Sequence, residues 1–79
     1  MKLDDLGQGA LAVIAGITGG RGVLARMASL GLYAGKKIRV VQTAPFKGPI
    51  LVEDVATGAR TMIGRKIAAH VEIRNEEPR

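Results

Sequence analysis

The alternation of hydrophobic and polar positions predicts one short amphipathic helix over residues 22–30. Val23, Met27 and Leu30 follow one another at spacings of four and three residues, and Leu24 lies beside them. Side chains at this spacing share one face of an α-helix and form an apolar stripe. The polar residues that fall off the stripe and can face water are Arg21, Arg26 and Ser29. A helix this short is marginal alone, so we expect its stripe, Leu30 included, to plug a structure built by the rest of the chain.

A glycine ends this predicted helix. Gly31 follows the last turn, where the backbone often takes a positive φ that glycine adopts without a steric penalty. Leu32 is then the apolar residue that typically packs back onto such a helix end. Gly35 provides a second turn before the chain enters a strand.

Five short segments have the pattern of β-strands. The first, residues 10–17, is apolar on both faces, as a buried strand or a buried helix would be. Its brevity and the glycines around it favour a strand, and Gly16 predicts a bend or bulge in it. The other predicted strands are residues 37–44, residues 50–55, residues 60–63 and a last strand around Val71 and Ile73.

Turn residues separate these strands. Pro45 ends the second strand, and residues 46–49 form a turn. Residues 56–59 predict a hairpin loop, and residues 64–69 predict a connection of about one helical turn.

The two ends of the chain differ in character. Leu3 and Leu6 predict one further helical turn held against the core, with Asp4 or Asp5 as its cap. The last residues are polar. We expect a single domain over residues 1–74 and a flexible tail over residues 75–79.

These elements predict a mainly β fold. Five short strands and one helix in 79 residues fit a small closed or nearly closed antiparallel barrel, with the helix inserted between the first two strands. Aromatic residues make up only 3% of the chain, so its core must be aliphatic. We expect that core to use Ile38, Val40, Val52, Val71 and Ile73.

Composition and charge narrow the function classes. The chain has no cysteine, its longest apolar run is far shorter than a membrane-spanning helix, and its N-terminus does not read as a signal peptide, so we expect a cytoplasmic protein. The net charge of +5 suits an acidic protein, a nucleic acid or an anionic membrane. The basic residues are scattered, however, which fits an ordinary solvated surface equally well.

Nucleic-acid binding by a small barrel normally combines a basic groove with stacking aromatic side chains. The only aromatic residues are Tyr33 and Phe46, and neither falls in a predicted strand. We therefore keep nucleic-acid binding only as an alternative and do not expect it.

Candidate catalytic and metal-binding residues are few. The glycines of residues 16–22 lack the spacing of a phosphate-binding loop, so a flexible turn fits them better than an anion site beside Arg21. His70 is the only histidine, and strand alternation predicts that it is exposed. With Glu72 and no cysteine, it falls short of the three or four ligands of a metal site, so both are weak metal candidates. Ser29 is the only serine and has no assignable base, so we expect a non-enzyme.

A series of motifs extends over nearly the whole chain. It comprises G-G-R-G at residues 19–22, R-M-A-S-L-G-L at 26–32, Gly35, I-R-V at 38–40, A-P at 44–45, G-P at 48–49 and A-H-V-E-I at 69–73. In this combination they resemble the FeoA family, small cytoplasmic proteins of bacterial ferrous iron uptake. Ala34 departs from the family's usual proline, and residues 50–63 match only in pattern.

The resemblance implies a fold and a partner. The fold is an SH3-like β-barrel of five antiparallel strands with an inserted helix. The partner is FeoB, a membrane permease that carries a cytoplasmic GTPase domain. The resemblance supplies no catalytic residue and no cofactor, and it leaves direct binding of ferrous iron or another divalent cation open. The same barrel resembles the C-terminal domain of DtxR-type repressors, so a metal-responsive domain is a further alternative.

The helix-exit turn and the outer face of the helix are the predicted docking surface for the permease or for a second copy of the protein. Turns run over the surface, and clustered exposed apolar residues mark interaction sites. The candidate partner-binding residues are Arg21, Arg26, Leu32, Tyr33 and Phe46, with Ala34 beside them. The alternative is that Tyr33 and Phe46 merely cover the open end of the barrel.

Overall fold

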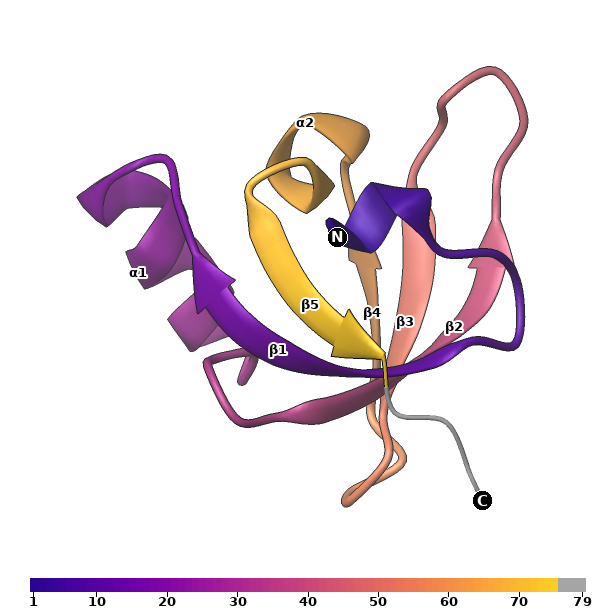
Figure 1. The fold of residues 1–79 in the computed structure, drawn as a ribbon, viewed down its shortest axis with the longest axis horizontal. Helices are drawn as coiled ribbons and strands as arrows, with labels where there is room; N and C mark the ends of the chain where they lie inside the picture. Colours follow the sequence, from indigo (N-terminus) through magenta and orange to yellow (C-terminus); the bar gives the residue numbers. More distant parts are fainter. Residues whose placement is uncertain (76–79) are drawn as a thin grey trace.

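The structure is a computed structural model that describes residues 1–75 (Figure 1). In chain order its elements are a 3₁₀ turn Leu3–Asp5, β1 Leu11–Ile17, α1 Arg21–Ser29, β2 Lys37–Thr43, β3 Ile50–Asp54, β4 Arg60–Ile63, α2 Arg65–Ala68 and β5 Val71–Asn75. Every predicted element is present, and α1 begins and ends one residue earlier than predicted. Asn75, assigned to the tail, belongs to β5, and the rest of that predicted tail lies outside the described residues.

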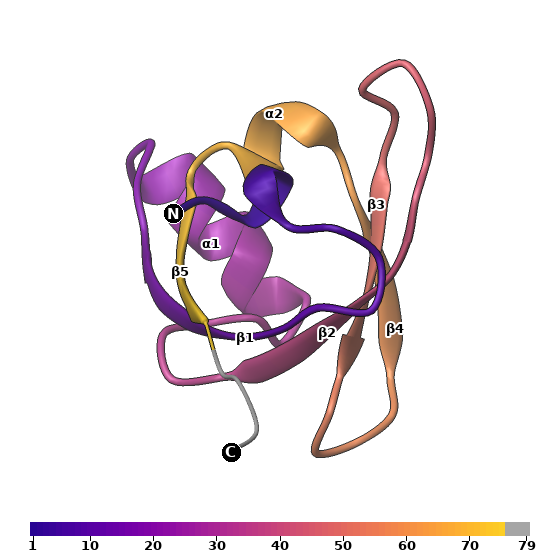
Figure 2. The same cartoon turned by 45° about the vertical axis from the view of Figure 1, so that its right-hand side comes forward.

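The five strands form one antiparallel sheet in the order β4-β3-β2-β1-β5. The sheet curls so that β4 and β5 face each other across the interior, and α2 connects them (Figures 1 and 2). Within residues 1–75 these two edge strands do not pair with each other, so the fold is barrel-like without being closed. The predicted insertion of the helix between the first two strands is confirmed.

Two irregularities bend the sheet. The pairing of β1 with β5 shifts register between Ile14 and Gly16, which confirms the predicted bulge at Gly16. A second shift, which the sequence did not reveal, lies between Val40 and Gln42, where β2 pairs with β3. An extra residue in one strand bends it and increases its twist, so both shifts help a short sheet to curl around its core.

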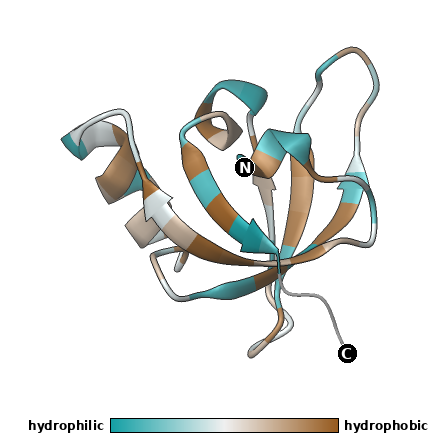
Figure 3. Ribbon diagram, viewed as in Figure 1, coloured by the Kyte–Doolittle hydropathy of each residue, from teal (hydrophilic) through white to brown (hydrophobic). Residues whose placement is uncertain are grey.

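The core is aliphatic, as predicted, and Ile38, Val40, Val52, Val71 and Ile73 are all buried in it. Figure 3 shows hydrophobic and hydrophilic residues alternating along β5, one face of which supplies the core. The remaining members of the core cluster are Leu3, Leu6, Ala12, Ile14, Met27, Leu32, Ile50, Ile63 and Ala68. Leu3 and Leu6 thus hold the N-terminal turn against the barrel, and Asp5 caps that turn by accepting a hydrogen bond from the Lys2 backbone N–H at 2.9 Å.

The end of α1 is a Schellman motif. Gly31 has φ 78°, its N–H donates to the Ala28 carbonyl at 2.9 Å, and the Leu32 N–H donates to the Met27 carbonyl at 2.9 Å. This 6→1 and 5→2 pair satisfies two carbonyls that the helix end would leave free. The predicted role of Gly31 and the packing of Leu32 back onto the helix are therefore confirmed.

The prediction that Leu30 plugs the barrel is wrong. Its side chain is 40% exposed, whereas Met27 and Leu32 are buried at 0% and 2%. Leu30 is the residue at which the helix ends, and the reversal at Gly31 turns Leu32, rather than Leu30, toward the core. Met27 and Leu32 are thus the two residues that seat the helix end.

Candidate partner-binding surfaces

The turn that follows α1 is held rigidly against the sheet. The Gly35 N–H donates to the Ile14 carbonyl of β1 at 2.7 Å, and the Lys36 N–H donates to the Tyr33 carbonyl at 3.1 Å. The Lys36 ammonium lies 5.3 Å from the centre of the Tyr33 ring, within the range of a cation–π interaction. Tyr33 is half exposed, so much of its side chain remains accessible to a partner.

Lys36 also joins this turn to the β3–β4 hairpin. Its Nζ lies 2.8 Å from Oδ2 of Asp54, the only charged residue within residues 1–75 that is buried. The hydrogen bond from Lys36 holds the pKa of the Asp54 carboxyl below its usual range, aided by the N–H of Ala56, which donates to Oδ1 at 2.9 Å. The same contact raises the pKa of Lys36. The pair is therefore ionised on both sides at neutral pH and fixes the position of the helix-exit turn.

Helix α1 contributes little to the core. Of its nine residues only Met27 is buried, and Leu24 remains 50% exposed although leucine normally favours the interior. Figure 1 shows α1 at one end of the molecule beside β1. We use the name helix-exit surface for the exposed apolar residues of this region together with the two arginines of the helix: Leu24, Leu30, Tyr33, Arg21 and Arg26.

The arginines of this surface are exposed, and no ion pair involving either is present within residues 1–75. Arg21 opens α1 and Arg26 lies in its last turn. A cation at the first turn is unfavourable for the helix itself, because the helix dipole is positive there. Local helix stability therefore does not explain Arg21, whereas Arg26 is favourably placed in the last turn. Both guanidinium groups are exposed and accessible to an acidic partner.

The structure contradicts one member of the predicted docking surface and separates another from it. Leu32 is buried, because the Schellman motif turns it inward, and cannot contact a partner. Phe46 is exposed, but it lies beyond the far end of β2, whereas Tyr33 precedes that strand. Seven strand residues span roughly 20 Å, so the two aromatic rings belong to different surfaces and form no shared stacking platform.

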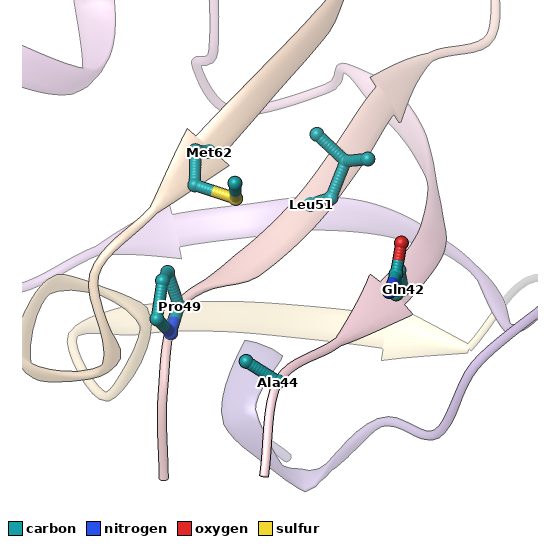
Figure 4. A pocket seen from close by; sticks show the side chains of 5 residues that line it. All are labelled: Gln42, Ala44, Pro49, Leu51 and Met62. Carbon is teal, nitrogen blue, oxygen red and sulfur yellow. The ribbon is translucent and has the colours of Figure 1, made fainter.

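A second apolar surface, which the sequence analysis missed, lies on the outer face of β2, β3 and β4. Gln42, Leu51 and Met62 are neighbours across these strands. With Ala44 and Pro49 they line an apolar hollow of about 110 Å³, toward which Leu51 and Met62 point from adjacent strands (Figure 4). In the sequence, this surface could have been recognised from Leu51 and Met62, which are apolar at positions where the alternation of their strands places side chains outward.

The two weak metal candidates contact different partners in the structure. His70 is half-buried rather than exposed, because it precedes β5 and packs against the loop before α1. Its Nδ1 lies 3.4 Å from the Thr18 hydroxyl, and its carbonyl accepts the Thr18 N–H at 2.8 Å. Glu72 is bound instead by Lys2, at 2.8 Å. Within residues 1–75 no three potential ligands among His, Cys, Asp and Glu lie together.

Residues 1–75 match the FeoA domain family. The chain belongs to the FeoA family. A crystal structure of an iron uptake regulatory protein (FeoA) is 29% identical, covers 96% of both chains and superimposes with a TM-score of 0.85. The solution structure of FeoA from Chlorobium tepidum is also 29% identical, over 95% of this chain and 70% of that one, with a TM-score of 0.83. No match was found among curated protein sequences.

The same fold occurs within larger metal-dependent regulators. A manganese-dependent transcriptional repressor in complex with manganese has a TM-score of 0.88 and 23% identity. It aligns with 96% of this FeoA-family chain, which spans only 36% of the repressor. This likeness shows the SH3-like fold alone, in agreement with the resemblance noted from the sequence.

Membership of the FeoA family supports a role in ferrous iron transport. The family consists of small accessory transport proteins and is not a known enzyme family. None of the helices within residues 1–75 has the length and apolar character needed to cross a bilayer.

Proposed function

We propose that this FeoA-family protein is a cytoplasmic accessory module of ferrous iron uptake that docks on the cytoplasmic part of the FeoB permease. The contact is made by the helix-exit surface. The observation that carries this proposal is the exposure of Leu24, Leu30 and Tyr33 on and next to a helix that buries only Met27. Exposed apolar side chains of this kind gain free energy when a partner covers them.

The chemistry of the surface suits a protein partner. Tyr33 is of a residue type enriched at binding hot spots, and the Lys36 ammonium over its ring favours one ring orientation, which reduces the conformational entropy lost on binding. Arg21 and Arg26 provide a charged rim that would accelerate the encounter with an acidic surface. Through this contact the protein would be held near the inner membrane.

The experiment is a binding titration against the purified cytoplasmic region of the cognate FeoB permease, in its nucleotide-free, GDP-bound and GTP-bound states. We compare the wild type with the double variant Leu30→Ser and Tyr33→Ser. Both side chains are exposed, so the fold should persist, and the loss of two hot-spot contacts should weaken binding at least about tenfold. Leu32→Ser is unsuitable because that side chain is buried.

Met62→Ser is the matched control, since Met62 is 61% exposed but lies on β4, outside the helix-exit surface. It should bind like the wild type. A double variant that is folded and binds unchanged would refute the proposed surface, and an absence of binding in all nucleotide states would refute the proposed partner. Self-association that is lost in the double variant would instead assign the surface to a second copy of the protein.

A further inference from the structure

The loop between β2 and β3 carries a phenylalanine that the fold does not use. Phe46 is 99% exposed, at the tip of a loop that projects beyond the strands (Figures 1 and 2). Its backbone has φ 57°, as does that of Lys47. Positive φ is an outlier for a bulky residue, and glycine or asparagine would be better suited to it. Neither burial nor local conformation within residues 1–75 therefore explains a phenylalanine at this position.

The loop is nevertheless held together by hydrogen bonds. The Ala44 N–H donates to the Pro49 carbonyl and the Gly48 N–H to the Pro45 carbonyl, both at 3.1 Å. From α2, Arg65 Nε donates to the Gly48 carbonyl at 3.0 Å. A Cβ on Gly48 would lie 2.7 Å from that of Ala44, so the two sides of the loop are in close contact. The ring of Phe46 is thus carried by a projecting loop that these contacts stabilise.

The charge around the tip is positive. Residues 40–52 and residues 60–71 contain no carboxylate, and the hydrogen bond of Arg65 places α2 at the base of the loop. Lys47 is next to Phe46, and Lys66 follows Arg65; both lysines are exposed and have no ion pair within residues 1–75.

The N-terminal turn, which Arg65 contacts, contains acidic residues. Asp5 accepts the hydrogen bond from the Lys2 N–H, and Glu72 pairs with the Lys2 ammonium. Asp4 lies in the same turn, and its backbone carbonyl accepts a hydrogen bond from Arg65 Nη1 at 3.5 Å. With a net charge of +5 over the whole chain, the tip is a basic region of a basic protein.

We propose that residues 44–49 form a membrane-contacting tip, with the Phe46 ring inserted into the interface of an anionic lipid bilayer and Lys47, Arg65 and Lys66 directed at its headgroups. An aromatic ring flanked by lysines matches the layered chemistry of that interface, where the ring meets acyl chains and the ammonium groups stay at the phosphates. The proposal does not rest on docking to FeoB. It uses the opposite end of β2, because residues 44–49 follow that strand and Tyr33 precedes it.

The absence of tryptophan from the chain allows a direct test. Phe46→Trp provides a single tryptophan at the tip, which can be excited selectively over Tyr33, and Tyr33→Trp provides a matched one on the helix-exit surface. With vesicles of phosphatidylglycerol and phosphatidylcholine, the emission of Phe46→Trp should shift to the blue and become protected from a soluble quencher. The emission of Tyr33→Trp should not shift with these vesicles. Vesicles of phosphatidylcholine alone should leave the emission of both variants unchanged.

Sedimentation with the same vesicles measures the affinity. Phe46→Ser, at a fully exposed position, should retain the wild-type melting temperature and weaken binding about tenfold or more, because one large apolar side chain no longer leaves water. Lys47→Gln should weaken it about fivefold and reduce its dependence on salt.

Several results would overturn the proposal. One is that Phe46→Ser sediments with the vesicles as well as the wild type does. Another is that the emission of Phe46→Trp does not shift to the blue, or that the emission of Tyr33→Trp shifts equally. A blue shift that appears with the FeoB cytoplasmic region but not with vesicles would assign the tip to a protein groove. A shift that depends on protein concentration without lipid would assign it to self-association.

Discussion

The ammonium of Lys36 lies 2.8 Å from the carboxylate of Asp54, and this ion pair ties the helix-exit turn to the β3–β4 hairpin. Asp54 also organises the hairpin, because its carbonyl accepts the N–H of Gly58 at 2.7 Å and its own N–H donates to the Ala59 carbonyl at 2.8 Å. A single pair of residues thus connects the surface that we assign to a partner with a turn of the barrel.

This pair predicts a defined dependence of stability on pH. The pKa of Asp54 is lowered from 3.8, so its contribution is present above about pH 4 and is lost as pH falls through the lowered value. The pKa of Lys36 is raised from 10.5, so its contribution is complete below that value and is lost as pH rises through the raised one. The difference in melting temperature between the wild type and Lys36→Met should therefore be largest between these limits and narrow outside them.

Thermal unfolding monitored by circular dichroism across pH measures this difference. Lys2→Met is the control, because its pair with Glu72 is about 40% exposed on each side and should contribute less. A difference for Lys36→Met that is constant across the whole range would contradict the assigned role of the pair.

The seating of α1 predicts opposite results for two neighbouring apolar residues. Met27→Ala should lower the free energy of unfolding by about 2 to 5 kcal/mol, because a fully buried side chain leaves a cavity. Leu30→Ala should cost less than about 1 kcal/mol, since the residue is 40% exposed. Urea denaturation measures both values, and a larger loss for Leu30→Ala would show that Leu30 plugs the barrel after all.

Substitutions at Gly31, at the end of α1, should lower stability through backbone conformation and not through a steric clash. No atom lies within 4 Å of a Cβ built on Gly31, so Gly31→Val should destabilise through its φ of 78° alone, by more than about 1 kcal/mol. Gly31→Asn should be milder, because asparagine tolerates this conformation. Gly64 has φ −63°, and Gly64→Ala should change stability by less than about 1 kcal/mol. Equal melting temperatures for Gly31→Val and Gly64→Ala would refute the assigned cap.

A second glycine is restricted by both its backbone and its neighbours. At Gly19, φ is 93°, and an added Cβ would lie 3.0 Å from the His70 ring and 3.1 Å from Val23. Gly19→Ala should therefore destabilise by about 1 to 3 kcal/mol. In the double variant with His70→Ala, the stability lost through the clash with the His70 ring should be recovered. The loss that comes from the positive φ should remain.

Gly22→Ala serves as the matched control for Gly19→Ala. Gly22 lies in the first turn of α1 with open space around it, so alanine should be neutral or stabilise by up to about 1 kcal/mol. Comparable losses for Gly19→Ala and Gly22→Ala in urea denaturation would show that the loop before α1 is not restricted in this way.

The sequence predicted the elements because each was encoded locally. Alternation along residues 37–43, the 3-and-4 spacing around Met27, and the turn chemistry of Gly31 are all properties of a few consecutive residues. The five predicted core residues followed from the same alternation. Local patterns of this kind also support the family assignment, since the matching motifs include the L-G-L at the end of α1 and the G-P before β3, which occupy turns of the fold.

The tertiary structure alone decided which exposed residues share a surface. Leu30 and Leu32 are both apolar and two residues apart, and only the reversal at Gly31 turns one outward and the other into the core. Tyr33 and Phe46 appeared as one cluster of turn residues, but the length of β2 separates them. The outward apolar row of Leu51 and Met62 exists only through the register of β3 with β4. Burial and adjacency depend on how distant segments pack together, whereas periodicity reports only which face of its own element a residue occupies.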